Sequence, residues 1–233
     1  MGPVARILAL LVLPALVACG IPRDPEVTLE RVTGGTMRVG VTEADPFTIL
    51  EGDEPTGGVE VLLVEEFADS IDSEIEWITG SEEELFAALE VRELDLVIGG
   101  LTSTNPWSAK VTFTHPYLTT FATVGVPEQE QQGEDIAGME VAVEKGTDLA
   151  GLLGETDAEV ALVDDIALAD GAAAVENWLL DDLGLYDSDV RLKESDHVMA
   201  IQLGENDFLT TLERFLLHRE DHIESLLDRE GAL

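Results

Sequence analysis

Basic residues are scarce in this chain. Its 233 residues include 12 Lys and Arg against 49 Asp and Glu, which gives a formal net charge of -37. This balance argues against nucleic acid as a partner, because phosphate binding needs clustered Lys and Arg. An anionic membrane surface would also repel the chain. The acidic residues are dispersed along the whole sequence, which favours a halophilic protein whose self-repulsion is screened by salt.

Cysteine occurs only once, at Cys19, so no intrachain disulfide can form. Residues 1–6 carry one positive charge, and the apolar run 7–18 that follows is too short to cross a bilayer. Both features are typical of a secretory signal peptide. The sequence LVACG at 16–20 resembles a bacterial lipoprotein cleavage box. That resemblance implies a signal peptide over 1–19 and lipidation of Cys19; the alternative is an ordinary signal peptide that happens to contain a cysteine.

Motifs of common enzyme classes are also missing. The sequence contains no G-x-S-x-G elbow and no P-loop. With 49 acidic residues, no particular pair of carboxylates stands out for acid–base catalysis. His218 and His222 have helical spacing, but their order is not H-E-x-x-H and their surroundings are charged. We therefore expect a protein without catalytic residues, cofactor or metal.

The apolar pattern after residue 35 predicts alternating strands and helices. Short apolar runs at 37–41, 74–78 and 94–98 are typical of buried strands. Helical spacing over 59–71 and a capping box that begins at Ser81 predict helices between them. The resulting β-α-β-α-β order indicates a parallel sheet covered by helices.

The second half of the chain repeats this alternation less regularly. We expect an extended crossover at 120–126 and strands at 140–143, 160–163 and 197–202. Helices are predicted after 148, over 166–180, and as one long C-terminal helix from 204. The predicted organisation is a signal peptide at 1–19, a tether at 20–35, lobe 1 at 36–119 plus 204–233, and lobe 2 at 120–203, with hinge crossings near 119–126 and 198–204.

The segment 99–117 reads GGLTSTNPWSAKVTFTHPY. It resembles the signature of bacterial extracellular solute-binding proteins, family 3, which runs roughly G-L-T-I-T-x-x-R-x-x-x-x-x-F-S-x-P-Y. Further segments resemble that family in the same order: 37–41, 46–47, 57–62, 94–97 and 141–147. The resemblance covers roughly 36–230. It implies an α/β fold of the two-lobe, type II periplasmic-binding-protein kind, hinged, with mixed and mostly parallel central sheets.

The resemblance also implies a set of ligand contacts. Thr102 matches the hydroxyl position of lobe one that hydrogen-bonds the ligand, Gly100 matches the motif position before it, and Thr147 matches the turn of lobe two; all three are expected ligand contacts. Phe47 matches an aromatic residue that often stacks on the ligand, and Glu176 matches the acid that binds the ammonium group of an amino acid.

The family's carboxylate-binding Arg is replaced by Trp107. An indole offers one N–H donor and an electron-rich ring face, so it cannot neutralise a carboxylate. Either Lys110 or Lys145 takes over that role, or the ligand is not an ordinary α-amino acid. In the second case, Trp107 and Trp178 with nearby acids would suit a cationic or apolar solute. Packing within their own lobe is the alternative for both tryptophans, and core packing is the alternative for Phe47.

These observations predict an extracytoplasmic lipoprotein that binds a small polar solute, amino-acid-like or cationic, for an ABC-type importer. Its expected partners are the solute, the transporter permease and a membrane reached through the lipid anchor, and we expect a monomer. A ligand sensor or adaptor without transport is the first alternative. The second is an enzyme resembling cyclohexadienyl dehydratases, which the missing Arg disfavours because such an enzyme needs a basic anchor for its substrate.

Overall fold

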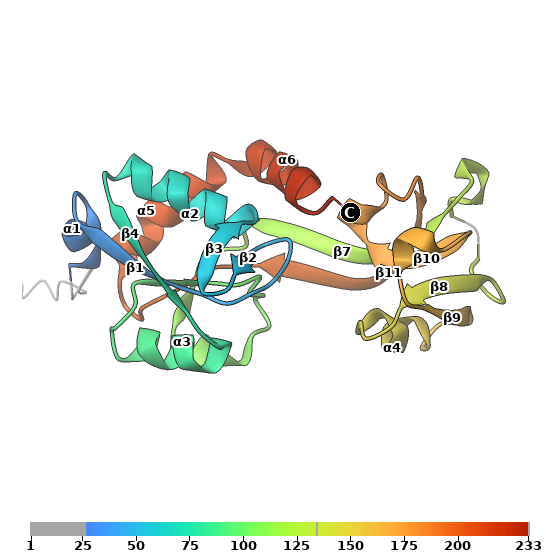
Figure 1. The fold of residues 1–233 in the computed structure, drawn as a ribbon, viewed down its shortest axis with the longest axis horizontal. Coiled ribbons are helices and arrows are strands. Elements are labelled where there is room, and N and C mark those ends of the chain that lie inside the picture. The colour runs from blue at the N-terminus through green and yellow to red at the C-terminus, as the bar shows by residue number, and fades with distance from the viewer. Residues whose placement is uncertain (1–26, 134, 233) are drawn as a thin grey trace, which may run out of the picture.

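A computed structural model describes residues 27–133 and 135–232. The molecule is elongated, with one sheet and most helices at one end and a second sheet at the other (Figure 1). We call the first sheet with its helices lobe one, and the second sheet with α4 lobe two. Two long strands, β7 (Leu118–Val126) and β11 (Tyr186–His197), run between the ends.

Lobe one is built on the predicted β-α-β-α-β unit, which the structure confirms. Strand β1 pairs in parallel with β4 on one side and with β5 on the other. Two short strands from later in the chain, β12 and β6, extend the sheet in antiparallel fashion. In spatial order the strands are β4 (Glu74–Thr79), β1 (Thr36–Val41), β5 (Leu96–Ile98), β12 (Ala200–Ile201) and β6 (Thr112–Phe113).

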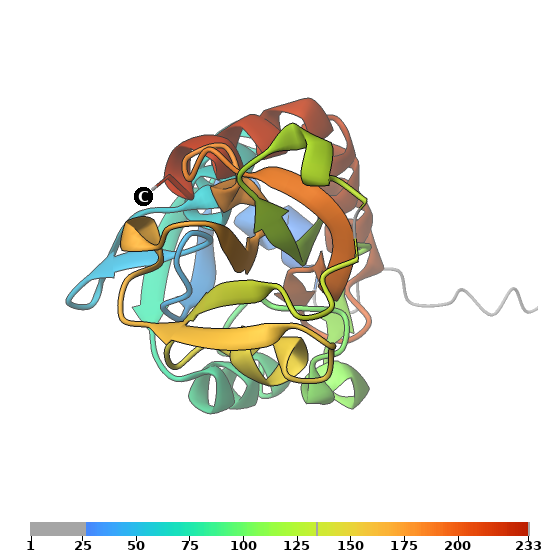
Figure 2. The same cartoon turned by 90° about the vertical axis from the view of Figure 1, so that its right-hand side faces the viewer.

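Helices cover both faces of this sheet because successive strand residues point to opposite sides. Leu96 and Ile98 pack in one core cluster with α2, α5 and α6, whereas Val97 between them packs in another with α3. Both views place α5 and α6 on one side of the molecule and α3 on the other (Figures 1 and 2). The helices are α1 (Thr28–Val32), α2 (Val59–Ser70), α3 (Glu82–Glu90), α5 (Asn206–Leu217) and α6 (Glu220–Glu230); a hairpin of β2 (Ile49–Glu51) and β3 (Glu54–Gly57) joins β1 to α2.

Lobe two holds a smaller mixed sheet. Strand β8 pairs in parallel with β9 and β10, while β7 pairs antiparallel with β10 and β11. Its spatial order is β11, β7, β10 (Ala172–Glu176), β8 (Glu140–Glu144) and β9 (Glu159–Val163), with the short helix α4 (Leu149–Leu153) between β8 and β9. The two-lobe α/β architecture predicted from the sequence is thus confirmed, and each sheet contains as many antiparallel as parallel pairings.

Several predicted elements were wrong. The helix expected over 166–180 is instead a 3-10 turn at Ile166–Leu168, strand β10 and a second 3-10 turn at Asn177–Leu179. The four consecutive buried residues of β10, 172–175, form a run that suits a central strand covered on both faces.

The prediction of one long C-terminal helix was also wrong, because the helix is interrupted between α5 and α6. Arg219 leaves helical geometry there and hydrogen-bonds Glu66 of α2. The strand predicted at 197–202 is divided between the end of β11 and β12. The segment expected to be a tether contains α1, while the predicted signal peptide and Cys19 lie outside the described residues.

The predicted lobe limits stay a prediction, although β12 pairs within the sheet of lobe one.

Candidate ligand-binding cleft

The direction of the strands decides which loops of lobe two face lobe one. Strand β7 leaves lobe one at Leu118, which pairs with His197 as β11 returns. Strand β10 runs antiparallel to β7 and ends at Glu176, opposite Ala122. Because β8 is parallel to β10, its carboxyl end at Glu144 points the same way. The loops after β8 and β10 therefore project toward lobe one, where ligands bind in open α/β sheets.

Thr147 and Glu176 meet in one pocket at that edge. Both line a cavity of about 130 Å³ together with Glu144 and Asp148. Thr147 is held in its turn by donating its hydroxyl hydrogen to the carbonyl oxygen of Glu144, at 2.9 Å. Apolar side chains complete the walls: Leu149, Ile166, Ala174, Val175 and Leu179.

Glu176 is a partly buried acid of this pocket. Burial raises the pKa of its carboxyl group; Lys193 opposes the rise and Asp148 adds to it. Glu176 and Lys193 both pair with Ala122, on either side of β7, so they occupy one row of the sheet. Lys193 itself forms an ion pair with Asp148, at 3.0 Å. The pocket thus presents a carboxylate that is partly desolvated, beside a lysine that already has a partner.

In lobe one, Gly100 lies in the turn after β5. Its φ of 62° lies in the left-handed region, and a Cβ there would lie 3.2 Å from the ring of Phe47, so the turn requires glycine. The Glu60 carboxylate accepts hydrogen bonds from the N–H groups of Gly99 and Gly100, at 2.7 and 2.8 Å. It also accepts one from the hydroxyl of Tyr117, at 2.7 Å. Glu60 therefore holds the turn that carries the signature segment.

The role of Glu60 was missed by the sequence analysis. The residue is fully buried in α2, and burial raises its pKa although the three hydrogen bonds oppose the rise. A glutamate between Val59 and Val61 at the start of an apolar helix face was the available signal. A buried acid at such a position needs partners of its own.

Thr102 lies where the chain crosses between the lobes. It forms an isolated antiparallel bridge with His197, and its hydroxyl is 3.1 Å from that of Thr104. His197 in turn pairs with Leu118 of β7, whereas Glu176 pairs with Ala122 of the same strand. Thr102 and Glu176 are therefore separated by four residues along β7. At the rise of an extended strand, that interval is about 13 Å.

Phe47 takes part in packing between the lobes. Its ring is 6% exposed and stacks on the His197 ring at a centroid distance of 4.1 Å. The edge of Trp178, from the 3-10 turn after β10, meets Phe47 at 6.0 Å. Phe47 therefore has little free surface in this conformation, and its contact with a ligand stays a prediction.

Trp107 and Lys110 lie away from the pocket of Thr147 and Glu176. Trp107 stacks on Phe86 of α3, with ring centroids 5.5 Å apart and an interplanar angle of 5°. The Lys110 ammonium lies 5.3 Å from the Trp107 ring and forms an ion pair with Glu90, at 2.8 Å. Lys145, the other candidate for a carboxylate anchor, forms an ion pair with Asp164, at 2.6 Å.

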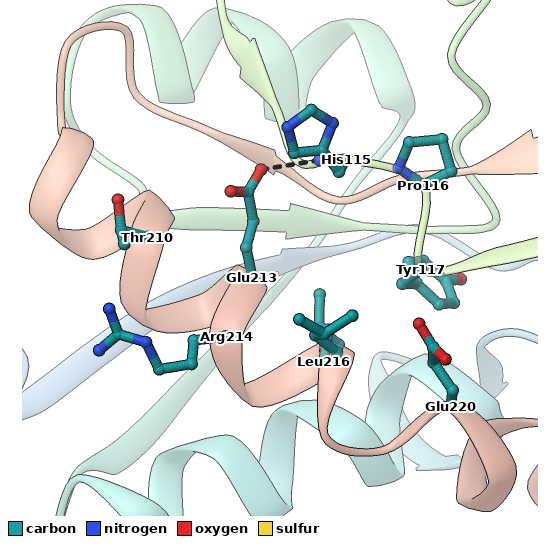
Figure 3. Close-up of a pocket in the computed structure, with 9 residues that line it drawn as sticks. His115, Pro116, Tyr117, Thr210, Glu213, Arg214, Leu216 and Glu220 are labelled. Atoms are coloured by element: carbon teal, nitrogen blue, oxygen red, sulfur yellow. Dashed lines mark hydrogen bonds between the residues drawn. The ribbon is translucent and has the colours of Figure 1, made fainter.

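A separate cavity of about 400 Å³ opens on lobe one (Figure 3). It lies between the segment 115–117 and helices α5 and α6, and no predicted contact lines it. Tyr117 forms part of its wall and reaches inward to Glu60. No group of His, Cys, Asp and Glu able to hold a metal ion occurs among residues 27–133 and 135–232. Within the same ranges, no helix is long and apolar enough to cross a membrane.

Two α/β lobes joined by a pair of strands, with a polar pocket at the edge between them, define a bilobal solute-binding protein. The model of the bacterial extracellular solute-binding proteins, family 3, matches residues 37–222, and the chain belongs to this family. The family resemblance carried by the signature segment is thus confirmed. No relative among curated proteins matches the chain.

Solved structures share the fold at low sequence identity. The L-cystine solute receptor of Neisseria gonorrhoeae, in its unliganded open conformation, has a TM-score of 0.69 at 18% identity, over 88% of this chain and 94% of that one. An ancestral cationic amino acid solute-binding protein has a TM-score of 0.64 at 21% identity, over 87% and 98%. A lysine-complexed putative ABC-transporter binding component from Wolinella succinogenes has a TM-score of 0.54 at 20% identity, over 84% and 95%.

Proposed function

We propose that this chain is an extracytoplasmic lipoprotein that captures a small polar solute, amino-acid-like or cationic, between its lobes and delivers it to an ABC-type importer. The observation that carries this proposal is the pocket shared by Thr147 and Glu176 at the edge of lobe two that faces lobe one. Two residues from different loops, each matched to a ligand contact of the family, line the same cavity. Membership of the solute-binding family supports the same proposal.

Capture would proceed by closure of the lobes about β7 and β11. Thr102 lies beside the strand crossing, whereas Thr147 and Glu176 lie further along lobe two. A rotation about the crossing would bring the loops of lobe two over a solute that rests near Thr102. Phe47, Gly100 and Trp107 are then proposed contacts on the side of lobe one.

The proposed attachment to the membrane depends on the lipid at Cys19. A surface with a formal charge of -37 gains no attraction from anionic lipids, so the anchor must supply it. Replacement of Cys19 by Ser should release the protein from the membrane fraction without changing solute binding.

Binding without turnover is the proposed activity. Two proteins of similar fold are an ancestral amino acid-binding protein that is a precursor of cyclohexadienyl dehydratase, and an ancestral cyclohexadienyl dehydratase. A dehydratase needs a cation to hold the carboxylates of its substrate. The candidate anchors Lys110 and Lys145, and Lys193 beside the pocket, already form ion pairs with acids of the chain, which favours the binding role.

The test measures solute binding and lobe closure together. A panel of amino acids, amines and short peptides is screened by calorimetry, and small-angle X-ray scattering follows the radius of gyration on binding. We expect the bound solute to contract the protein, and Thr102→Ala and Thr147→Ala each to weaken its binding. Thr211→Ala on α5 is the matched control. Binding that is unaffected by either cleft variant, or that leaves the radius of gyration unchanged, would contradict the proposal.

A further inference from the structure

We infer that the solute captured in this cleft is an organic cation that carries no carboxylate, such as an aliphatic amine or a guanidine. The inference rests on the proposed function and assigns the chemical class of its ligand. Three features support it: the ion pairs that already occupy the basic residues, the acidic wall of the pocket in lobe two, and the apolar side chains between the acids.

The basic residues leave no obvious partner for a ligand carboxylate. Among residues 27–133 and 135–232, every Lys and Arg except Arg214 has a carboxylate oxygen within 4.0 Å. Arg214 lines the other cavity, on α5 of lobe one. Trp107, which stands in place of the family's Arg, is stacked on Phe86. A carboxylate that needs a cationic partner in the cleft would have to displace an existing ion pair.

The wall of lobe two attracts the opposite charge. Glu144, Asp148 and Glu176 line the pocket, and within the described part of the chain only Asp148 of these three has an ammonium partner. Glu176 accepts no hydrogen bond from the described residues, although burial has removed part of its hydration. A cation placed there would replace the lost water with a charge-assisted hydrogen bond, which is stronger than one between neutral groups. A ligand carboxylate would instead meet a wall of its own sign.

The remaining walls suit an aliphatic body. Leu149, Ile166 and Val175 lie between the acids and offer apolar surface. A chain of methylene groups can rest on them while its charged end reaches Glu176. This combination of a few placed polar groups within an apolar lining is the usual form of a small-ligand site.

Lys193 is the basic residue best placed to bind a ligand carboxylate, which would favour a zwitterion over a cation. It occupies the same sheet row as Glu176, and a zwitterionic ligand would place its carboxylate on Lys193 and its ammonium on Glu176. The two ligand classes therefore predict opposite effects of removing this lysine. Without Lys193, a cation loses a repulsive neighbour, whereas a zwitterion loses its only attractive partner for the carboxylate.

The experiment compares ligands that differ only in the carboxylate. Calorimetry measures binding of cadaverine against lysine and of agmatine against arginine to the intact mature protein. We expect the decarboxylated member of at least one pair to bind about tenfold or more tightly than its amino acid, because the amino acid's carboxylate would lose hydration beside like-charged acids, a cost of about that order. Equal affinities, or tighter binding of lysine or arginine, overturn the ligand class.

Two variants sharpen the result. Glu176→Gln should weaken binding of the amine about tenfold or more, whereas Lys193→Gln should leave it equal or tighten it several-fold. Glu159→Gln makes the same charge change at the opposite end of the sheet and is the matched control. Loss of binding in Lys193→Gln overturns the inference.

The outcomes separate this inference from the proposed function. Tight binding and closure with neutral or acidic amino acids, but not with the amines, would end the cation class and leave a solute-binding protein. Absence of binding and closure with every solute would end both.

Discussion

The two lobes hold their charged residues in different ways. In lobe one, the carboxylates of Glu60, Asp95 and Glu205 are at most 1% exposed. Each has partners from other segments: Glu60 receives N–H and O–H donors, Asp95 receives Arg31 and Arg38, and Glu205 receives the Thr28 N–H. Charges that are buried with full hydrogen bonding fix the segments that meet at them.

Lobe two has a smaller core and keeps its ion pairs near the solvent. Its two clusters contain far fewer large side chains than the main cluster of lobe one. The Lys145–Asp164 and Lys193–Asp148 pairs have largely exposed partners. The difference predicts that lobe one, in which the turn at Gly100 is fixed, is more stable than lobe two.

The sharpest way to break this comparison is to neutralise one matched carboxylate in each lobe. Burial raises the pKa of Asp95, but hydrogen bonds from Arg38 and Arg31 outweigh it and the pKa lies below its usual value. The same balance, with Arg191 and Thr123, lowers the pKa of Asp187 in β11. The side chain of Asp95 is 0% exposed and that of Asp187 is 23% exposed.

Asp95→Asn should therefore lower the free energy of unfolding by about 3–4 kcal/mol, since the partly exposed Arg31 and Arg38 both lose the charged acceptor that they share. Asp187→Asn should lower it by about 1 kcal/mol, because solvent screens that pair. Urea titration of both variants checks this, with the exposed Glu83→Gln as control. Equal losses in the two lobes would mean that burial of charge does not distinguish them.

The pH dependence of stability compares the same two carboxylates, and its direction follows from their lowered pKa values. Both carboxylates have a lower pKa when folded, so their stabilisation is present above the unfolded value near pH 4 and is lost as the pH falls through the folded value. We expect the pH dependence below pH 4 to shrink more in Asp95→Asn than in Asp187→Asn.

The parts of this architecture that follow from local pattern could be predicted. Buried apolar runs such as 37–41 predict strands, and the capping box at Ser81 predicts the start of a helix. The parallel β-α-β unit of lobe one follows from their alternation. The rule that loops after parallel strands meet at one edge also explains why Thr147 and Glu176 share a pocket.

Features that depend on tertiary partners could not be predicted. The charged strand β11 contains no apolar run and is recognised only by its pairing with β7 at the edge of the sheet, where charged residues prevent edge-to-edge association. The same limit applies to Phe47. A Pro-aromatic pair in a loop does not reveal that His197, which is distant in the sequence, stacks on the Phe47 ring.

His197 lies at the boundary between the two lobes and should show the next largest effect. Burial lowers its pKa to about 4, with a further reduction from Lys193 and an opposing effect of Asp196. Its Nε2 lies 2.8 Å from the Thr120 hydroxyl, and its Nδ1 has no hydrogen-bond partner among the described residues. Protonation in the folded state would therefore place a charge at a buried position where Nδ1 has no hydrogen-bond acceptor among the described residues.

Because the folded pKa of His197 lies below the unfolded value of 6.5, its stabilisation is complete above pH 6.5 and is lost as the pH falls toward 4. The loss relative to His197→Gln should reach about 3 kcal/mol. Urea titrations at several pH values measure it, and His115→Gln at an exposed position is the control. A stability difference between wild type and His197→Gln that does not vary with pH would rule out this account of the boundary.

The smallest effects are expected at the exposed lysines, one in each lobe. Lys110 with Glu90 and Lys145 with Asp164 are ion pairs in which both side chains are 45% or more exposed. Replacing either lysine by Gln should change the free energy of unfolding by no more than about 0.5 kcal/mol, because solvent screens such pairs. Amine binding should also be unchanged, since neither lysine lines the pocket of Thr147 and Glu176. If Lys110→Gln or Lys145→Gln instead abolishes solute binding while the stability stays constant, that lysine is a carboxylate anchor, and lobe closure must bring it into the cleft from where it now lies.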